Sequence, residues 1–138
     1  HVNDVCFIRP VFHEKKIIAF VNVRAHQLDM GGVTPGGFSG TKRNVYENGM
    51  VLGPMLIFEN DIPVRSTMSL IFDNTRFPTV LFPDFMSTFR QVQLGEKLVL
   101  ESISKYGVDA YKGTIRYLCD SSEETEHTRQ RVVSTEMG

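Results

Sequence analysis

A strongly apolar segment followed directly by a glycine-rich one is the feature that most constrains the fold of this chain. Residues 17–23, IIAFVNV, have the composition of a strand, and their continuous apolar character predicts burial on both faces. Seven of the chain's 11 glycines then fall between Gly31 and Gly53. Since glycine tolerates conformations and close approaches that other residues do not, we expect residues 29–63 to form an ordered, functional loop.

Two strand candidates precede this loop, at Val5–Ile8 and Ile17–Val23. They are joined through Pro10 and a polar turn at residues 13–16, which is typical of a β-hairpin. A further short strand is expected over Met55–Phe58.

The rest of the chain has helical patterning. A first helix is expected to end near Asn74, and Asp84 is expected to cap a long second helix whose apolar residues keep to one face. Gly107 is a natural C-terminal stop for that helix, and Asp109 is suited to cap a third one. These patterns predict helices over residues 64–134.

The predicted fold class is therefore α+β, with strands and the glycine-rich loop over residues 1–63 and helices over 64–134. The chain has the length of one domain, 138 residues. However, it begins without Met and runs at once into a strand, whereas a native terminus usually frays first. We therefore expect residues 1–138 to be an internal segment of a larger subunit.

Charge and composition exclude some classes of function. The net charge is −1 and no cluster of Lys and Arg occurs, so nothing indicates a nucleic-acid partner. No apolar run is long enough to span a bilayer, so no membrane association is expected. The two cysteines, Cys6 and Cys119, are far apart and are expected to be buried, reduced thiols. These features favour a cytoplasmic protein.

The motif H-x-x-D occurs twice near the start of the chain, at residues 1–4 and 26–29. The first copy precedes one strand of the predicted hairpin and the second follows the other, so the two motifs should meet at one end of it. Two imidazoles and a carboxylate with open positions suit a divalent metal such as Mn, Fe or Zn. The alternative is that these polar side chains only satisfy backbone groups at strand ends.

Two positive charges follow the glycines, at Lys42 and Arg43. They are suited to meet a carboxylate or phosphate of a substrate, or else are exposed loop charges. A nucleotide-binding P-loop is not indicated, because Pro35 interrupts the glycine run and no Gly-Lys-Ser/Thr follows it.

The segment from Pro10 to Pro54 reads PVFHEKKIIAFVNVRAHQLDMGGVTPGGFSGTKRNVYENGMVLGP. It resembles the hydantoinase B family. The segments LIFDNTRFP and LGEKLVLESISKYGVDAY are similar to later parts of the same family. The family includes hydantoinase and 5-oxoprolinase subunits and the large subunits of acetone and acetophenone carboxylases. The sequence that follows the glycines resembles the carboxylase members most. The resemblance implies that this chain is one segment of a longer subunit.

The resemblance also implies site residues. The metal ligands of the family's carboxylases match His1, Asp4 and His26 in order and spacing, and the expected ion is manganese, with zinc or iron as alternatives. It implies catalytic roles for His26 and Asp29, with the pair Gly31-Gly32 lining the same site.

The activity implied first is ATP-dependent carboxylation of a ketone, with ATP held by a partner subunit of the hydantoinase A type in a hetero-oligomer. The second is ATP-dependent hydrolysis of a cyclic amide. A third possibility is a noncatalytic interaction or scaffold segment, whose helices pack against partner subunits.

Overall fold

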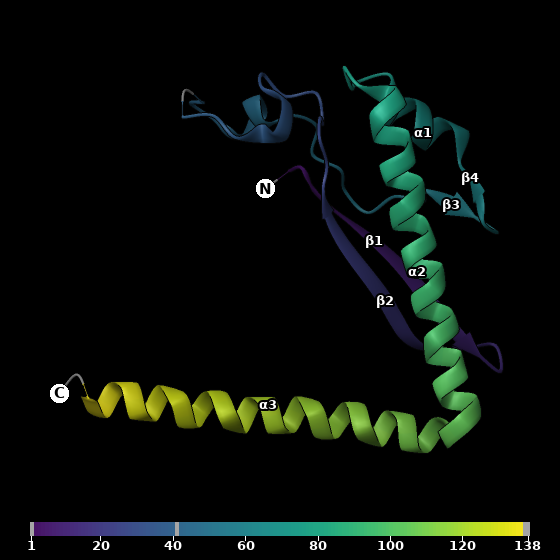
Figure 1. The fold of residues 1–138 in the computed structure, drawn as a ribbon, viewed down its shortest axis with the longest axis vertical. Coiled ribbons are helices and arrows are strands. Elements are labelled where there is room, and N and C mark those ends of the chain that lie inside the picture. The colour runs from purple at the N-terminus through teal and green to yellow at the C-terminus, as the bar shows by residue number, and fades with distance from the viewer. Residues whose placement is uncertain (1, 41, 137–138) are drawn as a thin grey trace. The chain divides into compact units, whose positions relative to one another are not determined.

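The computed structural model describes residues 2–40 and 42–136, with side chains as far as residue 126 (Figure 1). It confirms the α+β class. The chain divides into two compact units, residues 1–96 and residues 97–138. The elements in chain order are β1 (Asp4–His13), β2 (Lys16–His26), the 3-10 turns η1 (Pro35–Gly37) and η2 (Val45–Asn48), β3 (Phe58–Glu59), β4 (Ile62–Pro63), α1 (Arg65–Phe72), α2 (Pro78–Tyr106) and α3 (Val108–Glu136).

The predicted hairpin is present and is longer than expected. β1 and β2 pair antiparallel from Asp4 opposite His26 to His13 opposite Lys16, with a shift of the register between Val11 and Phe12. Glu14 and Lys15 form the two-residue turn with φ of 48° and 63°, the left-handed conformation that matches the twist of a tight hairpin. Pro10 lies within β1, which an edge strand tolerates because its outer N–H groups need no strand partner.

The expectation that the second strand is buried on both faces is wrong. Exposed and half-buried residues alternate along β2, and Phe20 is 64% exposed. One face of this two-stranded sheet packs on the core and carries the buried residues Phe7 and Val11. The other face is open. The alternation is that of a sheet with a single covered face.

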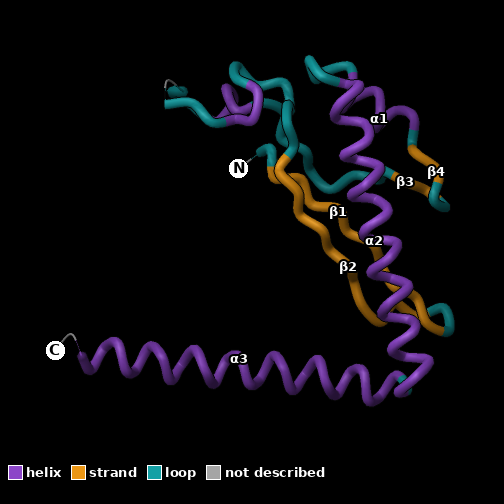
Figure 2. Tube along the Cα trace, viewed as in Figure 1, coloured by secondary structure: helices purple, strands orange, loops and turns teal. Residues whose placement is uncertain are grey.

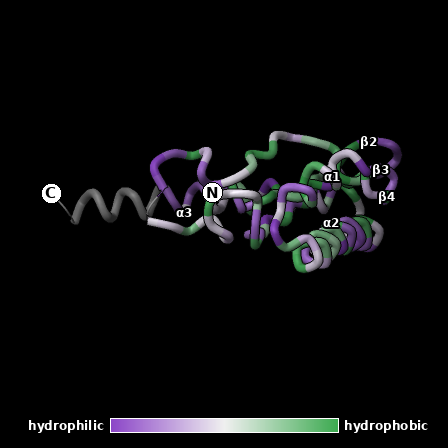
Figure 3. Tube along the Cα trace, turned by 90° about the horizontal axis from the view of Figure 1, so that it is seen from above, coloured by the Kyte–Doolittle hydropathy of each residue, from purple (hydrophilic) through white to green (hydrophobic). Residues whose placement is uncertain are grey.

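The core of the first unit lies between this inner face, α1 and the first part of α2. Phe85 is fully buried, and its ring meets those of Phe7 and Phe72 edge to face, at centroid distances of 5.2 and 5.4 Å. Both hydrophobic and hydrophilic residues occur along α2 (Figure 3). Its buried residues Leu81, Phe85, Phe89 and Val92 recur every three or four positions and therefore share one face of the helix. The buried cluster comprises Val5, Phe7, Met30, Ile71, Leu81, Phe85, Phe89 and Val92.

Arg9 joins three segments of the first unit. Its guanidinium donates to Glu96 of α2 at 2.5 Å and to Asp61, in the turn between β3 and β4, at 2.6 Å. It also lies 5.9 Å from the centre of the Phe89 ring. A charge on the inner face of the hairpin is therefore paired rather than buried alone.

Two boundaries differ from those predicted. α2 begins at Pro78, not at Asp84, because proline suits the first position of a helix, where its missing N–H has no partner to lose. The strand expected over Met55–Phe58 is wrong except at its last residue, since the structure instead forms a short pair, β3 at Phe58–Glu59 and β4 at Ile62–Pro63. The predicted helix end at Gly107 is confirmed, with a φ of 87° there.

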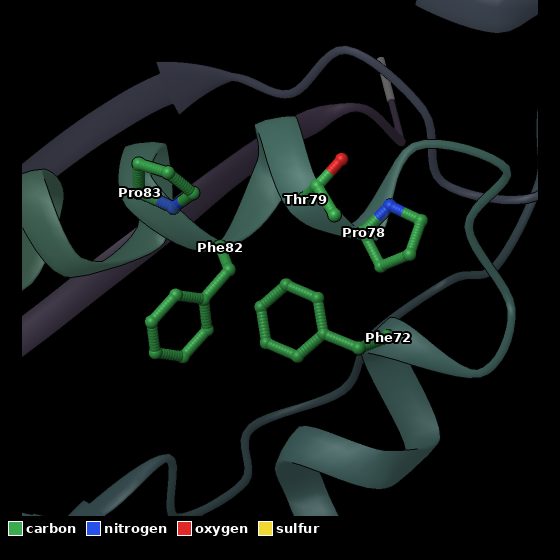
Figure 4. A pocket seen from close by; sticks show the side chains of 5 residues that line it. All are labelled: Phe72, Pro78, Thr79, Phe82 and Pro83. Atoms are coloured by element: carbon green, nitrogen blue, oxygen red, sulfur yellow. The ribbon is translucent and has the colours of Figure 1, made fainter.

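A shallow apolar hollow lies where α1 ends and α2 begins. The rings of Phe72 and Phe82 approach one another across it, and its other lining residues are Pro78, Thr79 and Pro83 (Figure 4). None of these five side chains is titratable, so the hollow offers no acid, base or metal ligand.

In the second unit, α3 begins at Val108, so Asp109 lies not at its cap but in its first turn, where its charge suits the positive end of the helix dipole. Cys119 of this helix is exposed, as is Cys6, so the expectation that both thiols are buried is wrong. Its apolar residues Ile115, Tyr117 and Leu118 are exposed. Among the described residues, no helix combines the length and apolar character that crossing a membrane requires.

Two glycines of the helices give a matched test of the packing between β2 and α2. A Cβ at Gly95 would lie 2.6 Å from a methyl carbon of Val21, whereas one at Gly113 would meet no atom within 4 Å. Gly113→Ala should raise the free energy of unfolding by about 0.5–1 kcal/mol, because alanine has the higher helix propensity. At Gly95 the overlap, typically costing about 1–3 kcal/mol, should outweigh that gain. Denaturant unfolding measures both, and equal effects of Gly95→Ala and Gly113→Ala would contradict the packing.

Candidate metal centre

Asp4 and His26 face each other at the open end of the hairpin. They are directly opposed in the register of β1 and β2, so their side chains leave the same face of the sheet. The ring Nδ1 of His26 and Oδ1 of Asp4 lie within hydrogen-bond distance, 2.9 Å apart. The hairpin thus brings together one residue from each H-x-x-D motif, as their spacing predicts.

The second ring nitrogen of His26 is held from the other side. Its Nε2 donates to the backbone carbonyl of Gly36 at 2.8 Å, and the ring of Phe38 stacks on the imidazole at a centroid distance of 5.1 Å and an interplanar angle of 22°. Histidines that bind metals usually donate their other N–H to a carbonyl or carboxylate, which fixes the ring. The Gly36 carbonyl occupies that position, which leaves Nδ1, the nitrogen that faces Asp4, as the one that a cation could take.

The separation of these two atoms fits a shared cation. Adjacent ligands in an octahedral shell with bonds of about 2.0–2.1 Å lie about 3 Å apart, and the Asp4 oxygen and His26 Nδ1 are 2.9 Å apart. The hydrogen bond from His26 holds the pKa of Asp4 below its ordinary value, and the positive charge of Arg24 acts in the same direction. Asp4 is therefore an ionised carboxylate near neutral pH, as a metal ligand must be.

Two protein ligands make an incomplete metal site. Among the side chains that the structure describes, those of residues 2–40 and 42–126, no group of three or more His, Cys, Asp or Glu is placed to hold a metal ion. His1, the third ligand expected from the sequence, lies outside the described residues.

Asp29, the other carboxylate expected at this site, has a different partner. It is fully buried, and its Oδ2 accepts from both the backbone N–H and Nε of Arg76 at 2.8 Å. Its Oδ1 accepts from Nη2 of Arg76 at 2.5 Å and from the backbone N–H of Gly31 at 3.1 Å. The Arg76 side chain thus binds both carboxylate oxygens, the geometry that makes such pairs strong.

These hydrogen bonds from Arg76 hold the pKa of Asp29 far below its ordinary value, against the opposing effect of burial. The same guanidinium donates to the carbonyl of Gly32 at 2.7 Å. The Asp29–Arg76 pair therefore ties the start of the glycine-rich loop to the segment between α1 and α2. Sequence reasoning missed Arg76, since nothing in a single sequence links two residues 47 positions apart; the only available signal was that a buried carboxylate needs a cation.

The glycines of the loop allow backbone segments to touch. Gly31 and Gly49 form an isolated antiparallel bridge, and a Cβ at Gly32 would lie 2.6 Å from the carbonyl oxygen of Asn48. Any side chain at Gly32 would push the two passes of the loop apart. This segment, drawn mostly as teal loop between β2 and β3 in Figure 2, is ordered by such contacts, as the sequence predicts.

Lys42 and Arg43, the predicted substrate-binding charges, lie on the same loop. The Lys42 ammonium donates to the carbonyl of Gly37 and to Oδ1 of Asn48, which braces the loop internally. The backbone N–H of Arg43 donates to Glu47 at 3.1 Å, and the residue is exposed. Contact of either side chain with a substrate stays a prediction.

The hairpin presents a carboxylate and an oriented histidine beside a braced glycine-rich loop, and together these form a candidate metal centre. The family described as Hydantoinase B/oxoprolinase matches residues 1–136 of this sequence. The chain therefore belongs to the hydantoinase B/oxoprolinase family, which confirms the resemblance seen in the sequence.

Several relatives show how much of a family member is present. An uncharacterized protein of Methanocaldococcus jannaschii, MJ0963, is 30% identical over 78% of this chain and 19% of its own length. The beta subunit of the Pseudomonas jessenii caprolactamase is 24% identical over 89% of this chain and 21% of its own length. The chain thus spans about a fifth of these curated relatives.

A solved structure shares the fold. The crystal structure of the ATP-dependent caprolactamase from Pseudomonas jessenii superposes with a TM-score of 0.82 at 23% identity, over 91% of this chain and 22% of that one. Other sequence relatives, 24–28% identical, are named as a D-/L-hydantoinase subunit, two 5-oxoprolinases and the delta subunit of an acetophenone carboxylase. Several relatives are thus named as subunits of larger enzymes.

The depressed pKa of Asp29 predicts a specific dependence of stability on pH. The ionised carboxylate stabilises the fold above its unfolded pKa of about 3.9, and this contribution is lost as the pH falls toward the lower folded value. Asp29→Asn should therefore lower the Tm at pH 7, and its deficit relative to wild type should shrink below about pH 4. Thermal unfolding from pH 7 to pH 3 measures this. The exposed Asp73→Asn is the control, and a deficit of Asp29→Asn that does not change with pH would contradict the role given to the pair.

Proposed function

We propose that this chain is the metal-binding segment of an ATP-dependent enzyme subunit that hydrolyses cyclic amides. The observation that carries the proposal is the Asp4–His26 pair, with its 2.9 Å separation and the Gly36 carbonyl behind the ring. Hydrolysis of a cyclic amide is the reaction after which the caprolactamase, hydantoinase and 5-oxoprolinase relatives are named.

Asp4 and His26, together with His1, would hold the divalent cation, with manganese expected first and zinc or iron as alternatives. Such an ion, when bound, polarises a carbonyl or activates water for attack. The carboxylate of Asp4 contributes negative charge, and His26 contributes Nδ1 in an orientation set by Gly36.

The loop residues would shape the site rather than react. Asp29 is enclosed by Arg76 and backbone donors, so we assign it a positioning role in place of the catalytic one expected from the sequence. By holding Gly31 and Gly32, the pair fixes the start of the loop that carries Gly36 to the imidazole. Among the residues that the structure describes, Asp4 and His26 are those that would contact the cation directly.

The energy of ATP would enter through another subunit. Hydrolysis of a cyclic amide coupled to ATP needs a nucleotide-binding site, and the glycine-rich loop lacks the P-loop sequence. We therefore propose a hetero-oligomer with an ATP-binding subunit of the hydantoinase A type, which agrees with relatives that are named as beta or delta subunits.

ATP-dependent carboxylation of a ketone is the second candidate. It is favoured by the 25% identity to the acetophenone carboxylase delta subunit and by the sequence KRNVYENG after the glycines, which looks closest to carboxylases. Incorporation of labelled bicarbonate into a ketone distinguishes it from the ATP-dependent opening of a lactam.

Replacement of His26 tests the metal site in the full-length subunit assembled with its partner. His26→Ala should reduce bound divalent metal from about one ion per subunit to a small fraction and abolish turnover, because the remaining ligands cannot hold the ion. Metal content by mass spectrometry and ATP-dependent turnover are the two measurements.

His13→Ala is the matched control, since His13 lies at the far end of the same hairpin and should leave both values unchanged. A wild-type enzyme without metal would overturn the proposal. Full turnover in His26→Ala or Asp4→Asn would favour the third possibility, a noncatalytic segment.

A further inference from the structure

Phe38 is a large apolar side chain placed directly against the candidate metal centre. Its ring stacks on His26 at a centroid distance of 5.1 Å, yet 74% of the residue is exposed. By contrast, Phe85 and Phe89, which build the core, are 0% and 6% exposed. Most of the Phe38 surface is therefore accessible beside the polar pair Asp4 and His26.

The backbone directly before Phe38 is anchored by several hydrogen bonds, and the ring itself stacks on His26. The N–H of Gly36 donates to the carbonyl of Leu28 at 2.5 Å, and that of Gly37 donates to Thr34 at 3.2 Å. The carbonyl of Gly37 accepts from the ammonium of Lys42. Since Gly36 also accepts from His26, the turn that orients the imidazole is the one that presents Phe38.

The arrangement has one polar and one apolar side. A cyclic amide is divided in the same way, with a polar C(=O)–NH edge and a methylene edge across the ring. If the carbonyl lies at Asp4 and His26, the methylene edge comes to lie where an apolar surface is available, and Phe38 supplies one next to the imidazole. Apolar contact of this kind favours substrates with larger hydrocarbon edges.

We infer that Phe38 is a specificity-determining residue, which selects substrates by packing its ring against the methylene edge of a cyclic amide. This inference rests on the proposed function and names the substrate feature that the same site reads. Full burial of one methylene corresponds to about a fourfold gain in affinity, so a contact on one side should give about a two- to fourfold gain per methylene.

The test compares lactams with five-, six- and seven-membered rings in the full-length enzyme with its partner subunit. In wild type, kcat/KM should rise about two- to fourfold with each added methylene. Phe38→Ala should flatten this dependence to less than about 1.5-fold per methylene, while Phe38→Leu, which keeps apolar bulk, should give an intermediate slope. The slope with ring size is the readout that a merely structural role of Phe38 would not change.

Phe20→Ala is the matched control, because Phe20 is 64% exposed on the same hairpin but lies well before His26 on β2, opposite Pro10. It should keep the wild-type slope. Metal content of each variant is measured first, and Phe38→Leu carries the test if Phe38→Ala does not assemble.

The outcomes separate the two proposals. Turnover of lactams with the same slope in wild type, Phe38→Ala and Phe38→Leu overturns the inference but leaves the proposed function intact. No ATP-dependent turnover of any lactam by the wild-type enzyme overturns the proposed function and this inference with it.

Discussion

The pairing register of one β-hairpin is the constraint on which the site depends. Asp4 begins β1 and His26 ends β2, and the two residues are directly opposed at the open end of the hairpin. Their carboxylate and imidazole therefore leave the same face of the sheet and meet at 2.9 Å. A shift of the register by one residue would send one of them to the opposite face. The tight turn at Glu14 and Lys15 sets the first pairs, and the irregularity between Val11 and Phe12 then shifts the pairing by one residue, which brings His26 opposite Asp4.

A second set of contacts gives the site its shape without taking part in chemistry. Asp29 and Arg76 form a charge-assisted pair that holds the start of the glycine-rich loop, and the loop returns to His26 through the Gly36 carbonyl. Removing Arg76 would leave the buried carboxylate of Asp29 without compensation. The two aspartates of the H-x-x-D motifs thus have different tasks: Asp4 faces the imidazole, and Asp29 supports the backbone around it.

The sequence predicted those features that depend on local pattern. The hairpin, the ordered glycine loop, the helix end at Gly107 and the meeting of Asp4 with His26 all follow from periodicity, turn residues and spacing. The partner of Asp29 could not be predicted, because the ion pair joins segments 47 residues apart and a single sequence contains no record of such contacts. The open face of β2 was missed since an apolar run alone does not reveal how many layers cover a sheet. The start of α2 at Pro78 could have been predicted from the sequence, because proline is common at the first position of a helix.

The most direct test of the account is anomalous diffraction at the absorption edge of the bound metal, from crystals of the full-length subunit with its partner. A cation held by Asp4 and His26 should give a peak about 2.0–2.3 Å from an Asp4 carboxylate oxygen and from Nδ1 of His26, with Nε2 still bonded to Gly36. A peak elsewhere in the enzyme, with Asp4 and His26 still hydrogen-bonded to each other, would contradict the account.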